Sequence, residues 1–193
     1  MEAKGFLKAE YDQNLLNNRI LLMVKIYNYR TMNQKHIISI QISAAIITVS
    51  STRTRETDIS GKTLCEIFKN AGIPIYHYGI VQDSIESIRA EVYHSLVKSN
   101  CIVLNGGTGL TYDDCTIEAV MPLLDKKIDG FGELFRMKSY QEIGTSSMLS
   151  RALAGICHGK AIFCIPGSTP AVTLAAKELI IPEIAHILSH ANK

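Results

Sequence analysis

Short apolar runs alternate along this chain with segments whose apolar residues recur at helical spacing. The first run is Ala44–Val49, and similar runs follow at Ile75–Val81 and Cys101–Leu104. Apolar runs of this length are typical of strands buried on both faces of a sheet. Strands separated by helices predict an open, mostly parallel sheet with helices on both faces, which is a three-layer α/β/α fold.

Helices are predicted wherever apolar residues recur every three or four positions between turn residues. The predicted helices are Gly61–Ala71, one that begins after a cap at Ser84, Thr116–Met121 and Pro170–Leu188. Pro182 lies inside the last of these, where its missing amide predicts a kink or a break. Gly155–Ile165 holds two apolar stretches around His158-Gly159 and predicts a short β-hairpin.

Charge divides the chain into two unequal parts. Residues 1–36 carry six basic and three acidic side chains, whereas residues 37–193 have 14 basic and 15 acidic ones. We expect a basic N-terminal extension over 1–36 and a single domain over 37–193. The six cations are scattered, without stacking aromatics, and therefore do not indicate a nucleic-acid partner. No apolar run reaches the roughly 18 residues that a membrane span requires, so no membrane partner is expected.

The cysteines indicate a reducing compartment. The chain has five of them, an odd number, and none forms a C-x-x-C pair. That pattern argues against a disulfide framework and against a structural zinc site, and it favours reduced, buried thiols. The N-terminus also lacks the layout of a signal peptide, so a cytoplasmic location is expected.

Ligands of parallel α/β sheets bind beyond the carboxyl ends of the strands. That rule points to three loops of this chain: Ser50–Ser60, Gln82–Ser84 and Asn105–Asp114. The third loop contains Gly106-Gly107-Thr108-Gly109 directly after a predicted strand. Glycines allow close approach of the backbone, and successive amides form an anion pocket. The turn therefore favours phosphate binding over a plain tight turn, although it matches neither a Walker A loop nor a G-x-G-x-x-G fingerprint.

Carboxylates stand beside this turn. Asp114 follows it, with Asp113 before and Glu118 after, and Asp83 ends the preceding strand in a similar way. One interpretation is helix capping, with Asp114 or Thr116 at the N-cap and Glu118 in the first turn. The other is Mg²⁺ binding, because Mg²⁺ prefers carboxylates together with substrate phosphates. The two interpretations are compatible.

Several ordered segments resemble the MogA/MoaB family of molybdenum-cofactor biosynthesis, which includes the G domain of gephyrin. The resemblance covers about residues 43–190. The segments that carry it are Asp58-Ile-Ser-Gly61, Val81-Gln-Asp83, Gly106-Gly-Thr-Gly109, Asp114-Cys-Thr-Ile-Glu-Ala119, Gly130-Phe-Gly-Glu-Leu-Phe-Arg136, Leu149-Ser-Arg-Ala-Leu-Ala-Gly155 and Pro166-Gly-Ser-Thr-Pro-Ala-Val172.

The resemblance implies a function and a set of site residues. It implies Mg²⁺- and ATP-dependent adenylylation of molybdopterin with release of pyrophosphate, in a protein that assembles as trimers or as hexamers. Asp83 and Asp114 occupy the positions of the family's two catalytic aspartates, where they would orient Mg²⁺. The expected substrate-binding residues are Gly106, Gly107, Thr108, Gly109, Thr116, Glu118, Ser146, Gly167, Ser168, Thr169 and Pro170.

One position departs from the family pattern. The residue before Asp114 is commonly Arg in the family and is Asp113 here, which places an anion beside the expected phosphate site. Two unit charges about 4 Å apart interact by roughly 1 to 4 kcal/mol between bulk water and a protein surface. A non-catalytic oligomer that holds molybdopterin, for instance for a downstream metal-insertion enzyme, is therefore the alternative. The sequence leaves open whether molybdenum or tungsten is the final metal.

Overall fold

The computed structural model describes residues 40–193. The predicted basic extension over 1–36 lies outside the described residues. The described part forms one sheet of six strands in the order β2-β1-β3-β6-β5-β4. The strands are β1 (Ala44–Val49), β2 (Ile75–Val81), β3 (Cys101–Asn105), β4 (Lys126–Lys127), β5 (Leu153–Cys157) and β6 (Lys160–Ile165).

The sheet is mostly parallel, as predicted. Strands β2, β1, β3 and β6 run in the same direction, with Ile46 paired to Val103 and Val103 paired to Phe163. Strand β5 returns antiparallel to β6 and confirms the predicted hairpin, whose turn holds His158 and Gly159 with positive φ angles. The two-residue strand β4, which the sequence did not predict, pairs antiparallel to β5 at the sheet edge.

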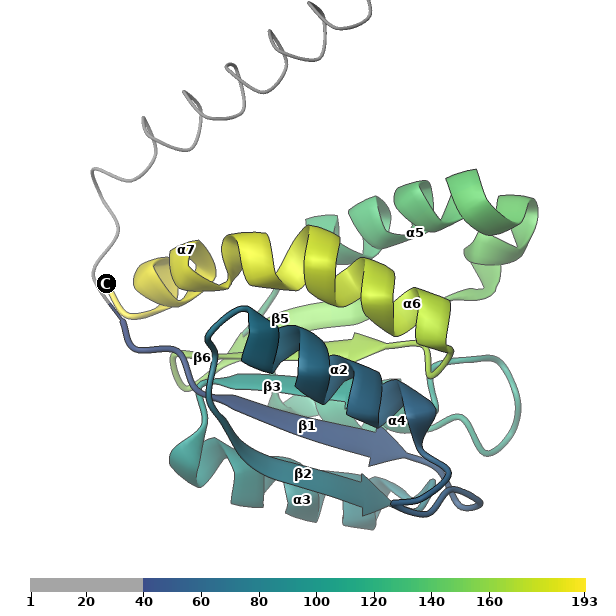
Figure 1. Ribbon diagram of the computed structural model, residues 1–193, viewed down its shortest axis with the longest axis horizontal. Helices are drawn as coiled ribbons and strands as arrows, with labels where there is room; N and C mark the ends of the chain where they lie inside the picture. The colour runs from purple at the N-terminus through teal and green to yellow at the C-terminus, as the bar shows by residue number, and fades with distance from the viewer. Residues whose placement is uncertain (1–39) are drawn as a thin grey trace, which may run out of the picture. The chain divides into compact units, whose positions relative to one another are not determined.

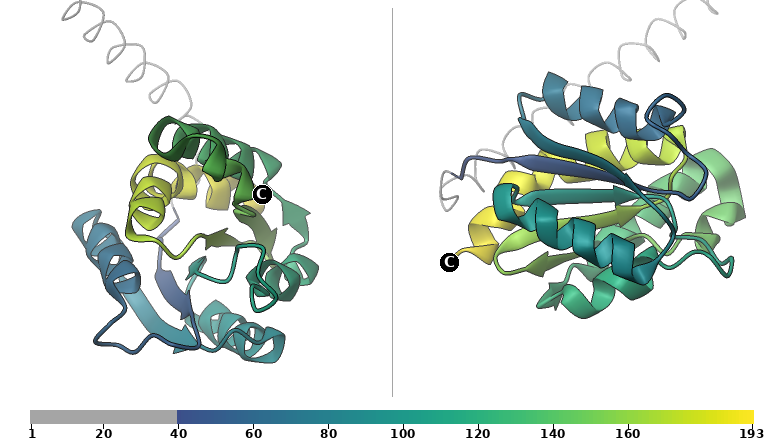
Figure 2. Two further views of the ribbon diagram at one scale, coloured as in Figure 1. Left: turned by 90° about the vertical axis from the view of Figure 1, so that its right-hand side faces the viewer. Right: turned by 90° about the horizontal axis from the view of Figure 1, so that it is seen from below.

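Helices cover both faces of the sheet and give the expected three layers (Figures 1 and 2). Alternate strand residues point to opposite faces, so Ile46 and Val103 belong to one apolar cluster while Ile47 and Leu104 belong to the other. The first face is covered by α2 (Ile59–Asn70), α5 (Asp129–Ile143), α6 (Thr169–Leu174) and α7 (Ile181–Ala191). The second face is covered by α3 (Ile85–Lys98) and α4 (Thr116–Val120).

Helix starts show which capping predictions are right. Ser84 caps α3, because its hydroxyl accepts from the Ser87 amide at 3.2 Å. The predicted cap of α4 is wrong, since its N-cap is Cys115 and makes no side-chain bond. Neither predicted residue is available, because Asp114 accepts hydrogen bonds from Thr111 and the Thr116 hydroxyl donates to the Gly106 carbonyl.

The irregularity expected at Pro182 lies in the turn before it. A π-helical segment, Ala175–Ile180, connects α6 to α7, and Pro182 occupies the first turn of α7. The ring of a proline inside a helix clashes with the carbonyl four residues earlier. For Pro182 that carbonyl belongs to Glu178, which lies in the wider π-helical segment. The chain therefore remains helical instead of breaking.

The sequence analysis missed the helix α5. Polar residues fill this segment, and only Phe131, Gly132, Phe135 and Ser139 are buried along its 15 residues. Because so few positions face the core, the apolar residues of this segment show only a weak helical periodicity. A 3₁₀ segment, Gly144–Leu149, follows it, and another, Met121–Leu123, follows α4.

All five cysteines are free thiols, as expected. Three are buried, and burial raises the pKa of each of the five above its ordinary value. Within residues 40–193, no helix has the length and apolarity that crossing a bilayer requires.

Candidate functional site

The three loops predicted to hold a ligand meet at one edge of the sheet. Parallel pairing aligns Val49 with Val81, and Asn105 with both Thr48 and Ile165. The loops that follow β1, β2, β3 and β6 therefore leave the sheet side by side. A buried Asn105 side chain joins two of them, since its amide donates to the Thr48 hydroxyl at 2.9 Å and its oxygen accepts from the Ser60 hydroxyl at 3.2 Å.

The glycine-rich turn follows β3 at the centre of this edge. Gly106 and Gly107 have φ angles of +101° and +60°, which side chains rarely allow. A Cβ on Gly106 would lie 2.3 Å from the Val49 carbonyl oxygen, so the close approach of the turn to β1 also requires glycine. Neither the Gly107 amide nor the Thr108 amide makes a hydrogen bond to any residue of 40–193. Two successive donors are thus available to an anion.

Asp83 and Asp114, the two residues expected to be catalytic, both lie against this turn. A Cβ on Gly107 would approach Asp83 Oδ1 to 3.3 Å, and one on Gly109 would approach Asp114 Oδ2 to 2.7 Å. Asp83 Oδ2 accepts from the amide and the hydroxyl of Ser51, at 2.7 and 2.8 Å. The turn and both carboxylates therefore form one site at the sheet edge.

Hydrogen bonds keep Asp114 ionised. Its Oδ2 accepts from the amide and the hydroxyl of Thr111 at 2.8 and 2.6 Å. Desolvation by burial raises the pKa of Asp114, but these bonds, the Gly109 amide and the nearby Arg151 outweigh it and lower the pKa below its usual value. The site therefore presents a negative carboxylate at neutral pH.

The two carboxylates suit a magnesium ion that is shared with a substrate. The hydrogen bonds from Ser51 to Asp83 and from Thr111 to Asp114 use Oδ2 of each carboxylate. Residues 40–193 contain no group of three or more His, Cys, Asp and Glu side chains placed to hold a metal. Mg²⁺ ordinarily takes one or two protein carboxylates and completes its shell with phosphates and water. Asp83 and Asp114 fit that pattern.

A cavity of about 290 Å³ opens beside the turn. Seven of the expected site residues line it: Gly107, Thr108, Gly109, Asp114, Ser146, Gly167 and Ser168. Its other wall comes from α5 and the 3₁₀ segment after it, which supply Phe135 and three further serine hydroxyls at Ser139, Ser147 and Ser150. The sequence analysis expected only Ser146 of this wall. The spacing of Phe131, Phe135 and Ser139 on one helical face was the signal that indicated it.

The second expected ligand loop, Pro166–Pro170, contacts the glycine turn directly. The Gly106 amide donates to the Ile165 carbonyl at 3.0 Å, and a Cβ on Gly167 would lie 3.1 Å from Gly106 Cα. Ser168 also caps α6, where its hydroxyl accepts from the Ala171 amide at 3.4 Å. Thr169 and Pro170 are exposed at the start of α6 and do not line the cavity.

Thr116 and Glu118 lie on the far side of Asp114. The buried Thr116 hydroxyl donates to the Gly106 carbonyl at 2.8 Å, so Thr116 supports the turn from beneath. Glu118 forms an ion pair with Arg151, and the Arg151 hydrogen bond lowers the pKa of Glu118. Arg151 also donates to the Asp114 carbonyl at 2.9 Å. Glu118 and Arg151, but not Thr116, line a second cavity of about 440 Å³, which shares Gly109 and Asp114 with the first.

Asp113, the departure from the family pattern, is exposed to solvent. It lines neither of the two cavities that share Asp114. A cation nevertheless lies beside Asp114, because Arg151 contacts the Asp114 backbone and lowers its pKa. Screening by water keeps the interaction of an exposed charge with the site small.

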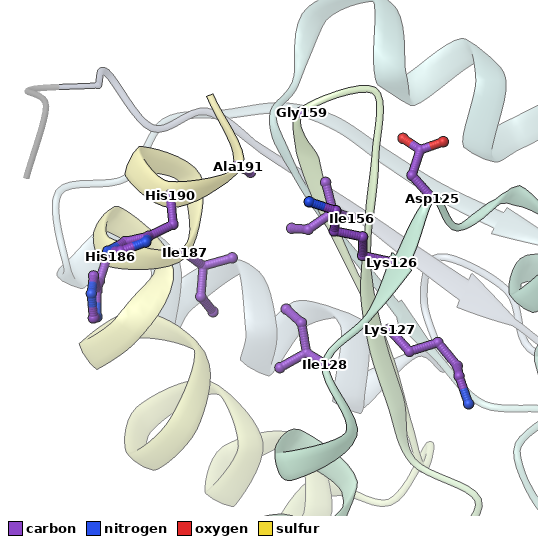
Figure 3. Close-up of a pocket in the computed structure, with 10 residues that line it drawn as sticks. All are labelled: Asp125, Lys126, Lys127, Ile128, Ile156, Gly159, His186, Ile187, His190 and Ala191. Carbon is purple, nitrogen blue, oxygen red and sulfur yellow. The ribbon is translucent and has the colours of Figure 1, made fainter. Parts of the chain in front are cut away.

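A larger cavity, of about 590 Å³, lies at the opposite end of the sheet (Figure 3). It is lined by the edge strand β4, by Gly159 of the hairpin turn and by His186 and His190 of α7. Gly159 precedes β6, whereas the glycine turn follows the parallel strand β3. None of the expected site residues lines this cavity.

Together, the fold and this edge define a three-layer α/β domain whose glycine turn and two carboxylates lie at the carboxyl ends of the parallel strands. Residues 45–186 match the family described as "Probable molybdopterin binding domain". A protein named "Molybdenum cofactor biosynthesis protein B" from Bacillus cereus is 51% identical over 150 residues, which are 76% of this chain and 89% of that protein.

Two solved structures have the same fold. One, described as molybdenum cofactor biosynthesis protein B, has 49% identity and a TM-score of 0.75 over 80% of this chain and 98% of that one. The other is the tungsten cofactor synthesizing protein MoaB from Pyrococcus furiosus, with 35% identity and a TM-score of 0.75 over 81% and 100% of the two chains. The chain belongs to the MogA/MoaB family of molybdopterin-binding proteins, on the MoaB side.

Proposed function

We propose that this protein adenylylates molybdopterin at the glycine edge, with ATP as the donor and Mg²⁺ as the metal. The observation that carries the proposal is the pair of carboxylates, Asp83 and Asp114, on either side of a glycine turn whose Gly107 and Thr108 amides make no hydrogen bond within residues 40–193. One substrate phosphate held by those amides would lie between the two carboxylates. Adenylyl transfer joins two phosphates and therefore requires such a place.

The proposed reaction joins the molybdopterin phosphate to the α-phosphorus of ATP. An oxygen of the molybdopterin phosphate attacks that phosphorus, a new P–O bond forms, and the bond between the α-phosphorus and the bridging oxygen breaks. Pyrophosphate leaves with the electrons of the broken bond. A phosphate is already anionic at neutral pH, so the chain needs no strong base and contributes by positioning and charge stabilisation.

The residues divide this work between them. The Gly107 and Thr108 amides hold phosphate oxygens as fixed donors, and the serine hydroxyls of the α5 wall surround the pterin end in the 290 Å³ cavity. The second cavity, on the other side of Asp114, leaves room for the nucleotide. Mg²⁺ bound by Asp83 and Asp114 would supply neutralisation of the charge that develops on the phosphates.

Other expectations accompany this proposal. The five free thiols support a cytoplasmic location, where cysteines remain reduced. Assembly into trimers or hexamers is proposed from the family resemblance.

The test is pyrophosphate release from ATP in the presence of molybdopterin and Mg²⁺. Wild-type protein is expected to form adenylylated molybdopterin, and Asp83→Asn and Asp114→Asn are expected to lower kcat by at least about 100-fold, as loss of transition-state charge stabilisation does. Thr63→Ala, a change at a half-buried position of α2 outside the site, is the control. Molybdopterin binding without any product, under every divalent metal tried, would replace this proposal with the non-catalytic binding function.

A further inference from the structure

A fully buried carboxylate lies in the first loop of the glycine edge. The Asp58 side chain has no exposed surface. It accepts hydrogen bonds from the hydroxyls of Thr48 at 2.5 Å and Tyr78 at 2.7 Å, and from the Gly61 amide at 3.0 Å. A buried charge is costly unless donors and an opposite charge surround it. These hydrogen bonds therefore hold the Asp58 side chain, and the loop around it, in one position.

Arg53 supplies the opposite charge, and it also reaches another loop. Its Nη1 lies 3.2 Å from Asp58 Oδ1 and donates to the Ser60 hydroxyl as well. Its Nη2 donates to the Gly167 carbonyl at 3.1 Å, across 114 positions of the sequence. One guanidinium thus connects the buried carboxylate of the first loop to the loop Pro166–Pro170.

The carbonyl that Arg53 binds belongs to Gly167, which lies in close contact with Gly106 of the other ligand loop. A Cβ on Gly167 would lie 3.1 Å from Gly106 Cα and 3.8 Å from Arg53 Nη1. Gly167 and Gly107 also line the same cavity of about 290 Å³. A displacement of Gly167 would therefore change the width of the cavity beside the phosphate-binding turn.

We propose that Arg53 is the positioning residue that fixes the Pro166–Pro170 loop against the glycine turn and so sets the affinity for the pterin substrate. The proposal rests on the proposed function for the identity of the substrate. Arg53 acts through Gly167, and the side chains of the α5 wall remain where they are. The loss of Arg53 should therefore weaken pterin binding and leave ATP binding and kcat largely unchanged.

The geometry requires arginine and not merely a positive charge. The planar guanidinium offers parallel donors in a fixed fork, so one nitrogen binds Asp58 and Ser60 while the other binds Gly167. A lysine ammonium is a compact point charge on a flexible stem and does not span these acceptors in the same way. Arg53→Lys keeps the charge beside Asp58 and removes the bridge, which separates the two roles.

The experiment compares Arg53→Lys and Arg53→Ala with Arg55→Ala. Arg55 is a matched control, because it belongs to the same loop and, among residues 40–193, its side chain bonds only to the Tyr78 carbonyl at 3.4 Å and to the face of the Tyr78 ring. Arg53→Lys and Arg53→Ala are both expected to raise the KM for molybdopterin about tenfold or more, with the KM for ATP and kcat within about twofold of wild type. Arg55→Ala should leave all three values within about twofold.

A second measurement does not depend on activity. Hydrogen exchange of the Gly167, Ser168 and Thr169 amides should become at least about threefold faster in Arg53→Lys than in wild type, and remain unchanged in Arg55→Ala. If wild type forms no adenylylated product but Arg53→Lys still exchanges faster, the proposed activity is wrong and the positioning of the Pro166–Pro170 loop by Arg53 is still supported. Two results would overturn the proposal. One is an Arg53→Lys protein with the wild-type KM for molybdopterin and the wild-type exchange rates, and the other is an equal rise in the KM values for ATP and for molybdopterin. Arg53→Lys retains the charge beside Asp58, so the test survives if Arg53→Ala does not fold.

Discussion

Replacing Gly106 by alanine tests the backbone of the glycine turn most sharply. The φ angle of Gly106 is +101°, and an added Cβ would lie 2.3 Å from the Val49 carbonyl oxygen. A residue held in a sparsely populated backbone region costs about 1 to 3 kcal/mol. Overpacking against a neighbour that does not shift adds about 1 to 3 kcal/mol more. The change should therefore lower the free energy of unfolding by about 4 kcal/mol.

Thermal unfolding, followed by circular dichroism, measures this change. For a domain of about 150 residues, 4 kcal/mol corresponds to a fall in Tm of about 8 to 16 °C. Gly72→Ala is the control for strain alone, because its φ is +74° and no atom lies within 4 Å of an added Cβ. It should cost about 1 to 2 kcal/mol.

Gly130→Ala is the control for alanine in open space. Gly130 lies in α5 with nothing within 4 Å of an added Cβ, so the change should be neutral or stabilising by up to about 1 kcal/mol. The expected order of Tm is therefore Gly130→Ala, Gly72→Ala, Gly106→Ala, from highest to lowest. A Gly106→Ala protein as stable as Gly72→Ala would refute the close approach of this turn to β1.

Three further predictions concern charge and thiols. The pKa of Asp58 is lowered in the folded protein, because hydrogen bonds outweigh the desolvation that raises it. Its contribution to stability is complete above the ordinary carboxyl pKa and is lost as pH falls through the lower folded value. The free energy of unfolding of wild type, measured with urea, should therefore fall steeply below about pH 4. Asp58→Asn should be less stable than wild type at pH 7, and its free energy of unfolding should fall less over the same pH range. Arg151→Ala removes the bond to the Asp114 carbonyl and should lower kcat/KM about tenfold, since bonds to charged groups contribute about 1.5 to 3 kcal/mol. Arg89→Ala, which loses bonds to the backbone carbonyls of Glu118 and Ala119 but leaves the bond to the Asp114 carbonyl in place, should stay within about twofold in the same assay. Alkylation at pH 8 should be at least about tenfold slower for all five native thiols than for free cysteine, and urea should abolish the difference; fast native labelling would contradict the raised thiol pKa values.

The architecture followed from the sequence because its central strands, β1 and β3, are buried on both faces. Every residue of β1 and β3 is buried, which produces the continuous apolar runs that predict a parallel sheet. Helix α5 escaped prediction for the opposite reason. Four buried positions in 15 residues leave a polar segment whose helical character depends on tertiary packing.

The site was predictable in part because glycines and carboxylates mark strand ends. The topology rule indicated that Asp83 and the glycine turn meet at one edge, although 22 residues separate Asp83 from Asn105. The bridge of Arg53 to Gly167 was not predictable, since no local pattern links residues 114 positions apart. The capping predictions at Asp114 and Thr116 failed because both side chains bond within the turn itself.

The most direct test of the central claim is the place where a nucleotide phosphate binds. We would determine a crystal structure of the protein with AMP and Mg²⁺. The phosphate is expected within hydrogen-bonding distance of the Gly107 and Thr108 amides, with Mg²⁺ on Asp83 or Asp114 and with Asp113 pointing to solvent. A phosphate bound instead beside His186 and His190, in the cavity at the opposite end of the sheet, would contradict the assignment of the glycine edge as the site.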